Sequence, residues 1–490
     1  MLVTLVACYF AVTICIGFYA ARRVKNSADY LVAGRSLPLH MNTATVFATW
    51  FGAELILAVS STFLKEGLQG VVGDPFGAAF CLIFVALFLA APYYRLKLMT
   101  VGDFYKKRYN RTVELASAAA ISISYLGWSS ANLVALGIVI HTVSGNTITL
   151  EQGIVLGAVI VGIYTLFGGM WSVAFTDLFQ TVIIVAGLIY IAWMLAGMAG
   201  GVDKVVATAQ ASDRLKFFPG ASLHDWLGFI AAFVTMALGS VAQQDVFQRV
   251  TSARTEKIAR QGTLLGGSLY LLMAFIPMFI AVSALLIDPA MVKQMLSNEN
   301  DFQQVLPTLI LQRTPLFAQV LFFGALLSAI LSTASGTLLA PTAVITENVI
   351  QPLWGHKLSD RKMLVLLRLI LIGFTCCVTL FALQSESSMY QMVQDAYKVT
   401  LVAAFTPLIF GMFWRRATPQ GALLSMACGV VAWQYAEHFM SDALVPPQLV
   451  GLGSAIVGMI VGSLAPTLLG GQGHPEIVDL ARQPKMANNP

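Results

Sequence analysis

Charged residues are scarce in this chain. Asp, Glu, Lys and Arg make up 11% of its 490 residues, whereas hydrophobic residues make up 57%. A soluble globular protein carries roughly 25% charged residues, because its surface faces water. With a mean hydropathy of +0.77, the chain lacks the polar residues that would cover a water-soluble surface. We therefore expect an all-α integral membrane protein without a soluble domain, and its net charge of +5 does not indicate a nucleic-acid partner.

Residues that carry metal or catalytic chemistry are also few. The six cysteines lie in apolar stretches without the spacing of a metal site. The six histidines are scattered, and no His-Glu-x-x-His, Gly-x-Ser-x-Gly or dinucleotide-type glycine pattern occurs. This argues against an intramembrane enzyme, and we expect no catalytic residues.

Long apolar segments dominate the sequence, and a run of ~20 residues spans the ~30 Å hydrocarbon core of a bilayer. We expect about 13 transmembrane helices, near residues 2–21, 40–63, 73–94, 113–142, 149–169, 172–200, 225–247, 263–287, 315–345, 363–384, 389–413, 420–440 and 448–469. The long segments 201–224 and 288–314 read as loops with short helices.

Positive charge predicts how these spans are oriented. If the first span starts outside, most of the 29 lysines and arginines fall in the connections on the inner side. Such a bias is typical of cytoplasmic loops. We therefore expect a multi-pass protein of the cell (inner or plasma) membrane, with its N-terminus outside and its C-terminus in the cytoplasm.

The second span contains Ala48-Thr49-Trp50-Phe51-Gly52-Ala53-Glu54, where a glycine and polar side chains interrupt the apolar run. Backbone can unwind at membrane depth only where it is buried in protein or lines a wet cavity. We predict a broken helix here, whose freed carbonyl groups face a cation.

A similar interruption occurs in the seventh span, at Gly239-Ser240-Val241-Ala242-Gln243-Gln244-Asp245. Paired broken helices in corresponding halves of a chain indicate a transporter's binding site. The pattern predicts two sets of five spans in opposite orientation. We divide the chain into an extra N-terminal helix and loop (1–39), a first repeat (40–200), a second repeat (225–413), two C-terminal helices (420–469) and a disordered cytoplasmic tail (470–490).

The ninth span carries adjacent hydroxyl groups at Ser332 and Thr333. These hydroxyls could bond back to their own helix or join helices. Beside a broken helix that offers carbonyl groups, they could instead bind a monovalent cation, which needs several oxygen ligands.

Several motifs make the chain resemble the sodium:solute symporter family over nearly its whole length. They are Leu37-Pro38 before the broken helix, Thr100-Val101-Gly102-Asp103-Phe104 with Arg108-Tyr109, Tyr164-Thr165-Leu166-Phe167-Gly168-Gly169-Met170-Trp171-Ser172-Val173 with Thr176-Asp177 and Gln180, and Ser328-Ala329-Ile330-Leu331-Ser332-Thr333. The resemblance implies a leucine-transporter-like fold with an inverted five-helix repeat. It also implies a co-transported Na⁺, held by the carbonyl groups of Ala48, Phe51 and Ala329 and the hydroxyls of Ser332 and Thr333.

Within that family, Ala48-Thr49-Trp50 and Leu126-Gly127-Trp128 look most similar to the choline transporter branch, which surrounds a quaternary ammonium with aromatic rings. This chain has Gln243 where that branch has a further tryptophan, and Ala78 where it has a tyrosine. The departures argue against choline itself, and we expect a small amine, quaternary ammonium or zwitterion such as an amino acid. We expect Thr49, Trp50, Glu54, Trp128, Gln243 and Gln244 to bind it.

Three charged residues have more than one interpretation. Glu54 could balance a cationic solute, accept a proton or face water in an outer vestibule, and Asp177 is predicted to cap a helix at an inner turn. Lys398 could pair with Asp395, extend toward the membrane surface or bind a substrate carboxylate. Its position therefore bears on the sign of charge of the solute.

The sequence thus predicts a sodium-coupled symporter that imports a small organic solute by alternating access. The alternatives are a symporter of a carboxylate-bearing solute that uses Lys398, and a non-transporting membrane sensor with the same fold. We expect the partners to be the solute and the bilayer, and the protein to be a monomer or loose homo-oligomer.

Overall fold

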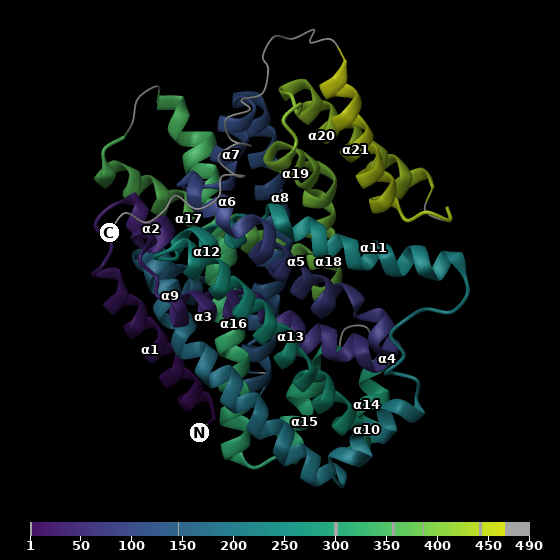
Figure 1. Ribbon diagram of the computed structural model, residues 1–490. Helices are drawn as coiled ribbons and strands as arrows, with labels where there is room; N and C mark the ends of the chain where they lie inside the picture. Colours follow the sequence, from purple (N-terminus) through teal and green to yellow (C-terminus); the bar gives the residue numbers. More distant parts are fainter. Residues whose placement is uncertain are drawn as a thin grey trace.

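The computed structural model describes residues 2–145, 147–297, 302–354, 358–385, 387–440 and 443–465, and its elements there are helical (Figure 1). This agrees with the all-α fold predicted from composition. The tail 470–490, for which we expect disorder, lies outside the described residues.

The first part of the chain forms the following helices, in which η denotes a short 3₁₀ or π-helical segment. They are α1 (Leu2–Ala21), α2 (Ser27–Val32), η1 (Ala33–Arg35), α3 (Leu39–Trp50), η2 (Glu54–Val59), α4 (Ser60–Gly70), η3 (Val72–Gly77), α5 (Ala78–Phe84), η4 (Val85–Leu89), α6 (Ala90–Leu96), α7 (Val101–Arg108), α8 (Arg111–Val143), α9 (Leu150–Ala199) and α10 (Val202–Ala211).

The second part continues in the same manner. Its helices are α11 (Leu223–Gly239), η5 (Ser240–Ala242), α12 (Gln244–Ser252), α13 (Glu256–Ile287), α14 (Pro289–Leu296), η6 (Phe302–Gln304), α15 (Val305–Arg313), α16 (Leu316–Val344), η7 (Ile345–Ile350), η8 (Gln351–Trp354), α17 (Asp360–Gln384), α18 (Met389–Thr400), η9 (Leu401–Phe405), α19 (Thr406–Phe413), α20 (Pro419–Phe439) and α21 (Pro447–Leu464).

The number of membrane spans differs from the expected thirteen in two places. Among the described residues, 10 helices are long and apolar enough to cross a membrane, or 11 if α3 and the segment Glu54–Gly70 form one broken span. Helix α20 is not among them, and the expected fifth and sixth spans form the single helix α9.

Helix α9 explains the second difference, because 50 residues at ~1.5 Å each would reach ~75 Å, more than twice the ~30 Å core. The helix breaks at Gly169, where φ is 49° and ψ is −142°. An added Cβ there would lie 2.4 Å from the carbonyl oxygen of Tyr30. The break lets two spans follow each other without a loop, which is why the sequence suggested two helices.

The expected break in the first repeat lies at Phe51–Ala53, where the axis bends by 52° between α3 and η2. Phe51 leaves helical geometry with ψ of 73°, although its N–H still bonds the carbonyl oxygen of Phe47 at 2.8 Å. A side chain at Gly52 would meet Thr333 Oγ1 at 2.8 Å. Only a glycine lets α3 and α16 approach so closely.

The second predicted break also occurs. Helix α11 ends at Gly239, η5 follows, and Gln243 is extended (φ −73°, ψ 140°) before α12 begins. The two broken helices are joined, because Leu37 N–H bonds Ser252 O at 3.0 Å and Arg254 N–H bonds Leu37 O at 2.9 Å. The inverted symmetry of the two sets of five spans stays a prediction.

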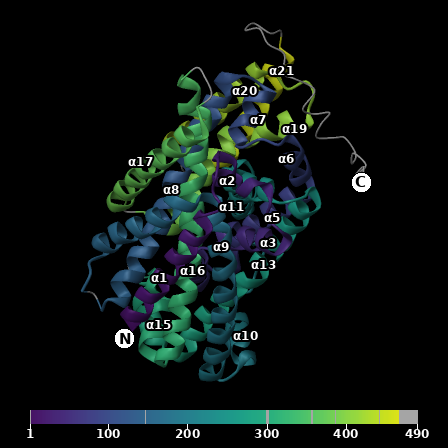
Figure 2. The same cartoon turned by 90° about the vertical axis from the view of Figure 1, so that its left-hand side faces the viewer.

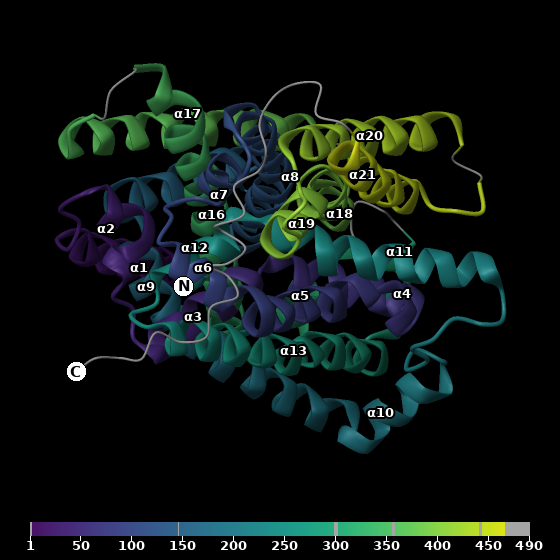
Figure 3. The same ribbon diagram turned by 45° about the horizontal axis from the view of Figure 1, so that its top comes forward.

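The helices α10, α14 and α15 gather at one end of the molecule, and α7 lies at the other (Figures 1 and 2). The segments 201–224 and 288–314 thus carry the short helices expected for them, opposite the basic connection around α7. Helices α20 and α21 pack along each other at the periphery, and α11 lies between α5 and α18 (Figure 3). The centre is built from α3, α8, α9, α13 and α16.

We predict that Gly169→Ala destabilises the protein by about 1–3 kcal/mol, because it adds a side chain at positive φ against a backbone carbonyl. Gly197→Ala is the matched control in the same helix, since nothing lies within 4 Å of its added Cβ. The melting temperature in detergent should fall for Gly169→Ala, and it should stay level or rise for Gly197→Ala. Equal transitions for both would contradict this role of the break.

Candidate functional site

The predicted cation ligands lie together where α16 passes the break after α3. Thr333 Oγ1 donates to Ala329 O at 3.0 Å and lies 3.5 Å from Ala48 O, which accepts from it. Thr333 also lies against Gly52, next to Phe51, because a Cβ added at Gly52 would be 2.8 Å from Thr333 Oγ1. One hydroxyl therefore bridges two carbonyl groups that the sequence assigned to sodium. Their role as ligands stays a prediction.

The hydroxyl of Ser332 has a partner that the sequence did not suggest. It donates to Asp177 Oδ1 at 2.6 Å, and Asp177 Oδ2 is buried without a hydrogen bond in the described structure. The expectation that Asp177 caps a helix is wrong. Asp177 lies inside α9, whose N-cap is Thr149, because α9 continues past the expected turn. A carboxylate thus stands beside the predicted cation ligands.

A buried arginine lies under the same break. Arg249 of α12 is 1% exposed, and its Nε and Nη2 donate to Thr49 Oγ1 at 3.1 and 2.9 Å. It also interacts electrostatically with Asp177 and Asp245. An added Cβ at Gly336 would lie 2.5 Å from Arg249 Nη2, so α16 needs a residue without a side chain at this position. In this conformation, the Thr49 hydroxyl therefore accepts hydrogen bonds from the guanidinium group.

Asp245 connects the second broken helix to the predicted solute residues. Trp50 Nε1 donates to Asp245 Oδ2 at 3.1 Å, and the hydroxyl of Tyr125 donates to Asp245 Oδ1 at 2.5 Å. The N–H of Asp245 donates back to the Tyr125 hydroxyl at 2.9 Å. Since Asp245 is fully buried, its charge is balanced by these donors and by Arg249.

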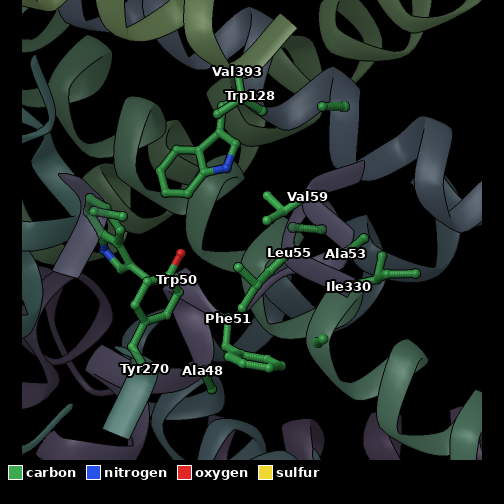
Figure 4. Packing of buried hydrophobic residues seen from close by; sticks show 14 of the residues in the cluster. Ala48, Trp50, Phe51, Ala53, Leu55, Val59, Trp128, Tyr270, Ile330 and Val393 are labelled. Carbon is green, nitrogen blue, oxygen red and sulfur yellow. The ribbon is translucent and has the colours of Figure 1, made fainter. Parts of the chain in front are cut away.

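Four aromatic rings meet beside this network. They belong to Trp50, Tyr125, Trp128 and Tyr397, and we call them the aromatic box. Their ring centroids are 5.9 Å apart for Trp50 and Trp128, 6.4 Å for Trp50 and Tyr397, 5.5 Å for Trp128 and Tyr397, and 5.9 Å for Tyr125 and Trp128. Figure 4 shows Trp50 and Trp128 on separate segments that face the same space. The structure thus brings the two predicted tryptophans together.

Sequence reasoning missed Tyr125, Tyr397 and Asp245 as neighbours of the two tryptophans. One signal was available, because Tyr125 and Trp128 are three residues apart on a helix and so share a face. Tyr397 had no such signal, since only the folding of α18 against α8 brings it to the box.

The two glutamines point to different places. Gln243 Nε2 donates to Ser124 Oγ at 3.0 Å and lies 3.4 Å from Thr400 Oγ1, beside the box. Gln244 accepts from the N–H of Val101 at 2.7 Å. The side chain of Gln244 is therefore directed toward α7, away from the aromatic box.

Lys398 and Glu54 are not among the residues whose rings form the box. Lys398 Nζ is 2.9 Å from Asp395 Oδ1 and 3.7 Å from Glu437 Oε1 of α20, so the pairing with Asp395 is present. Glu54 opens η2, and its Oε1 is buried without a hydrogen bond in the described structure. The segment η2, which begins with Glu54, contacts α18, the helix that carries Tyr397 of the box.

Comparisons with known proteins indicate the family and the fold of this chain. A sequence model described as the sodium:solute symporter family matches residues 30–429. The chain is 26% identical over 444 residues to the high-affinity proline transporter PutP of Bacillus subtilis (strain 168), covering 88% of this chain and 91% of that protein. It is 25% identical over 435 residues to the high-affinity choline transporter 1 of Torpedo marmorata, covering 86% and 74%.

The fold matches a solved structure described as the substrate-bound outward-open state of a Na⁺-coupled sialic acid symporter. The TM-score is 0.81 at 18% identity, over 97% of this chain and 99% of that one. At this identity the match speaks for the fold alone. The named relatives carry chemically different solutes, so the comparisons leave the solute of this chain open.

We predict that Thr333→Ala raises the Na⁺ concentration needed for half-maximal thermal stabilisation by about tenfold or more, because a lost ligand to a charged group costs ~1.5–3 kcal/mol. Thr342→Ala is the control in the same helix, since its hydroxyl bonds only Leu338 O among the described contacts. The measurement is the melting temperature against NaCl at constant ionic strength. An unchanged Na⁺ dependence in Thr333→Ala would remove this residue from the site.

Proposed function

The chain belongs to the sodium:solute symporter family, and on this premise we propose that it imports a small solute with a positively charged nitrogen, an amine or a zwitterion, together with Na⁺. Membership makes the protein a membrane transporter of a small molecule rather than an enzyme, with Na⁺ as the co-transported ion. The finer assignment rests on the aromatic box beside the predicted cation ligands.

The single observation that carries the proposal is the contact between Trp50 and Trp128, with ring centroids 5.9 Å apart, next to the Thr333 bridge. Aromatic faces attract cations, by about 2 kcal/mol or more where water is excluded. Trp50 is 7% exposed and Trp128 4%. We assign Thr49, Trp50, Glu54, Trp128 and Gln243 to the solute. To this set we add Tyr125 and Tyr397.

The balance of buried charges near Thr333 is a separate argument for the proposed sodium ligands. With both carboxyl groups ionised, Asp177 and Asp245 carry two negative charges, whereas Arg249, which interacts with both, carries one positive charge. A monovalent cation near Ser332 and Thr333 would balance the remainder, and unbalanced charge inside a membrane is costly. This supports Ala48, Phe51, Ala329, Ser332 and Thr333 as the sodium ligands.

In this proposal, the coupling between sodium and solute depends on which segments of the protein the bound ion brings together. Sodium bound between Ala48 and Thr333 would draw the break after α3 against α16 and favour the state that receives solute. The joint presence of ion and solute would then favour closure and opening to the other side. A potential of 100 mV adds about 2.3 kcal/mol per charge.

We further propose that the N-terminus is outside and the C-terminus cytoplasmic, and that the protein acts as a monomer or loose homo-oligomer.

A thermal-shift screen tests the solute class directly. Choline, betaine, proline, primary amines and carboxylates are added to purified protein with and without Na⁺. We expect Trp50→Leu and Trp128→Leu each to weaken a cationic binder by roughly 1–2 kcal/mol, or 5- to 30-fold, while its neutral isostere is unaffected. The control is Trp193→Leu, a tryptophan that is 72% exposed. Equal losses for charged and neutral compounds would contradict the proposal.

The alternative of a carboxylate-bearing solute depends on Lys398, and its ammonium group already has two carboxylate partners. We expect Lys398→Met to leave Na⁺-driven uptake of the solute from the screen within twofold in proteoliposomes. A sharp and selective loss of carboxylate uptake would instead favour the alternative.

A further inference from the structure

An open groove with a volume of about 500 Å³ lies along the first turns of α17. Trp354 of η8 and Leu358, just before α17, line it together with residues of α17 itself. Helix α17 runs along the outer edge of the molecule (Figures 2 and 3), and its most apolar window is only 28% buried. The groove shares no residue with the aromatic box or the proposed sodium ligands, so it belongs to the outer surface of the protein.

The residues that α17 contributes to the groove form a stripe with a charged end and an apolar end. Arg361 and Lys362 lie in the first turn, Val365 and Leu366 one turn later, and Leu369 after a further turn. Residues four apart share one face of a helix. The eight residues from Arg361 to Leu369 cover ~12 Å at ~1.5 Å each. The groove thus has the polarity of a site for an amphiphile.

The position of α17 places this stripe across the membrane boundary. The helix is one of those long and apolar enough to span a bilayer, and the two basic residues begin it. Trp354 is 48% exposed, and tryptophan is enriched at the interface between headgroups and hydrocarbon. Val365 is 49% exposed and Leu369 60%. An apolar surface therefore continues from the two cations into the depth at which acyl chains lie.

The two basic side chains are available to an external anion. Both are exposed, and no carboxylate in the described part of the chain is within ion-pair distance of Arg361 or Lys362. Asp360, the preceding residue, is not among those that line the groove. The next arginine of α17 differs, because Arg368 Nε donates to Leu166 O at 3.2 Å. Only the cations at the groove face outward without a protein anion.

We propose that this groove binds one anionic phospholipid of the bilayer. Its phosphate lies at Arg361 and Lys362, and an acyl chain covers Val365, Leu366 and Leu369. Charge complementarity selects the headgroup, since a zwitterionic lipid brings no net charge to the two cations. The apolar stripe selects a lipid over a soluble anion, which would leave these side chains uncovered. The site goes beyond the proposed function and depends on neither the solute nor Na⁺.

The experiment counts lipids bound to the purified full-length protein by native mass spectrometry. Dioctanoyl phosphatidylglycerol is the anionic probe, dioctanoyl phosphatidylcholine has the same chains without net charge, and inorganic phosphate represents the free anion. The double variant Arg361→Gln/Lys362→Gln is compared with Lys257→Gln/Arg260→Gln. The control residues are exposed, begin the candidate span α13 and do not line the groove. They are also predicted to lie on the same membrane face.

We expect the wild type to hold one phosphatidylglycerol molecule more tightly than phosphatidylcholine. The affinity for that molecule should fall about fivefold in each single variant and about 30-fold in Arg361→Gln/Lys362→Gln, because each basic residue beside an anionic headgroup strengthens binding by about fivefold. Phosphatidylcholine affinity should stay within twofold, and the control variant should match the wild type. Equal weakening by the two double variants would overturn the proposal, as would equal wild-type affinity for the two lipids.

The apolar end of the groove has its own variant. Leu369→Ser should weaken both lipids by about fourfold, the contribution of roughly one buried CH₂ group. The side chain is exposed, so the substitution removes little packing from the fold. Unchanged affinity for both lipids in this variant, or displacement of phosphatidylglycerol by equimolar inorganic phosphate, refutes a lipid as the occupant.

The wild type alone decides the matter if the double variant does not fold. Raising ammonium acetate from about 50 to about 500 mM screens charges at a membrane surface. The dissociation constant of phosphatidylglycerol should then rise, whereas that of phosphatidylcholine should not. Phosphatidylglycerol binding that is independent of salt contradicts a role for the two cations. Failure of the solute screen would leave all these lipid measurements unchanged.

Discussion

The close approach of Gly52 to Thr333 holds the site together. A helix that unwinds inside a membrane leaves carbonyl groups without partners, and each of them costs several kcal/mol unless protein or an ion satisfies it. Here the Thr333 hydroxyl lies within reach of Ala48 O while it bonds Ala329 O. The missing side chain at Gly52 lets α16 come that near. The break is thus stabilised by a neighbouring helix.

The second broken helix supplies the charge of the site. Arg249 interacts electrostatically with Asp177 and Asp245, and its guanidinium group donates to Thr49 of the first broken helix. Asn42 Nδ2 also donates to Arg249 O at 2.7 Å. A buried ion pair contributes little net stability, but removing one partner is costly. Any movement of α3 relative to α12 must therefore carry this network along or replace its contacts.

The first residue of α12 is bonded to α7 by a different set of contacts. Gln244 accepts from the N–H of Val101, in the motif that begins with Thr100. Thr100 caps α7 together with Asp103, and its hydroxyl donates to Asn348 Oδ1 at 2.7 Å. A side chain at Gly102 would lie 2.3 Å from Asn348. The residues of this motif therefore position a short helix between α12 and η7 and do not contact the site.

The sequence alone determined the membrane location, most span boundaries, both helix breaks and the identity of Ser332 and Thr333 as paired hydroxyls. Each of these depends on hydropathy or on a local interruption of it, which neighbouring residues reveal. The tertiary structure decided that residues 150–199 form one helix broken at Gly169, that Asp177 faces Ser332, that Gln244 turns away from the box and that Tyr397 joins it. These features depend on which faces of distant helices pack together, and a helical pattern read from one segment does not contain that information.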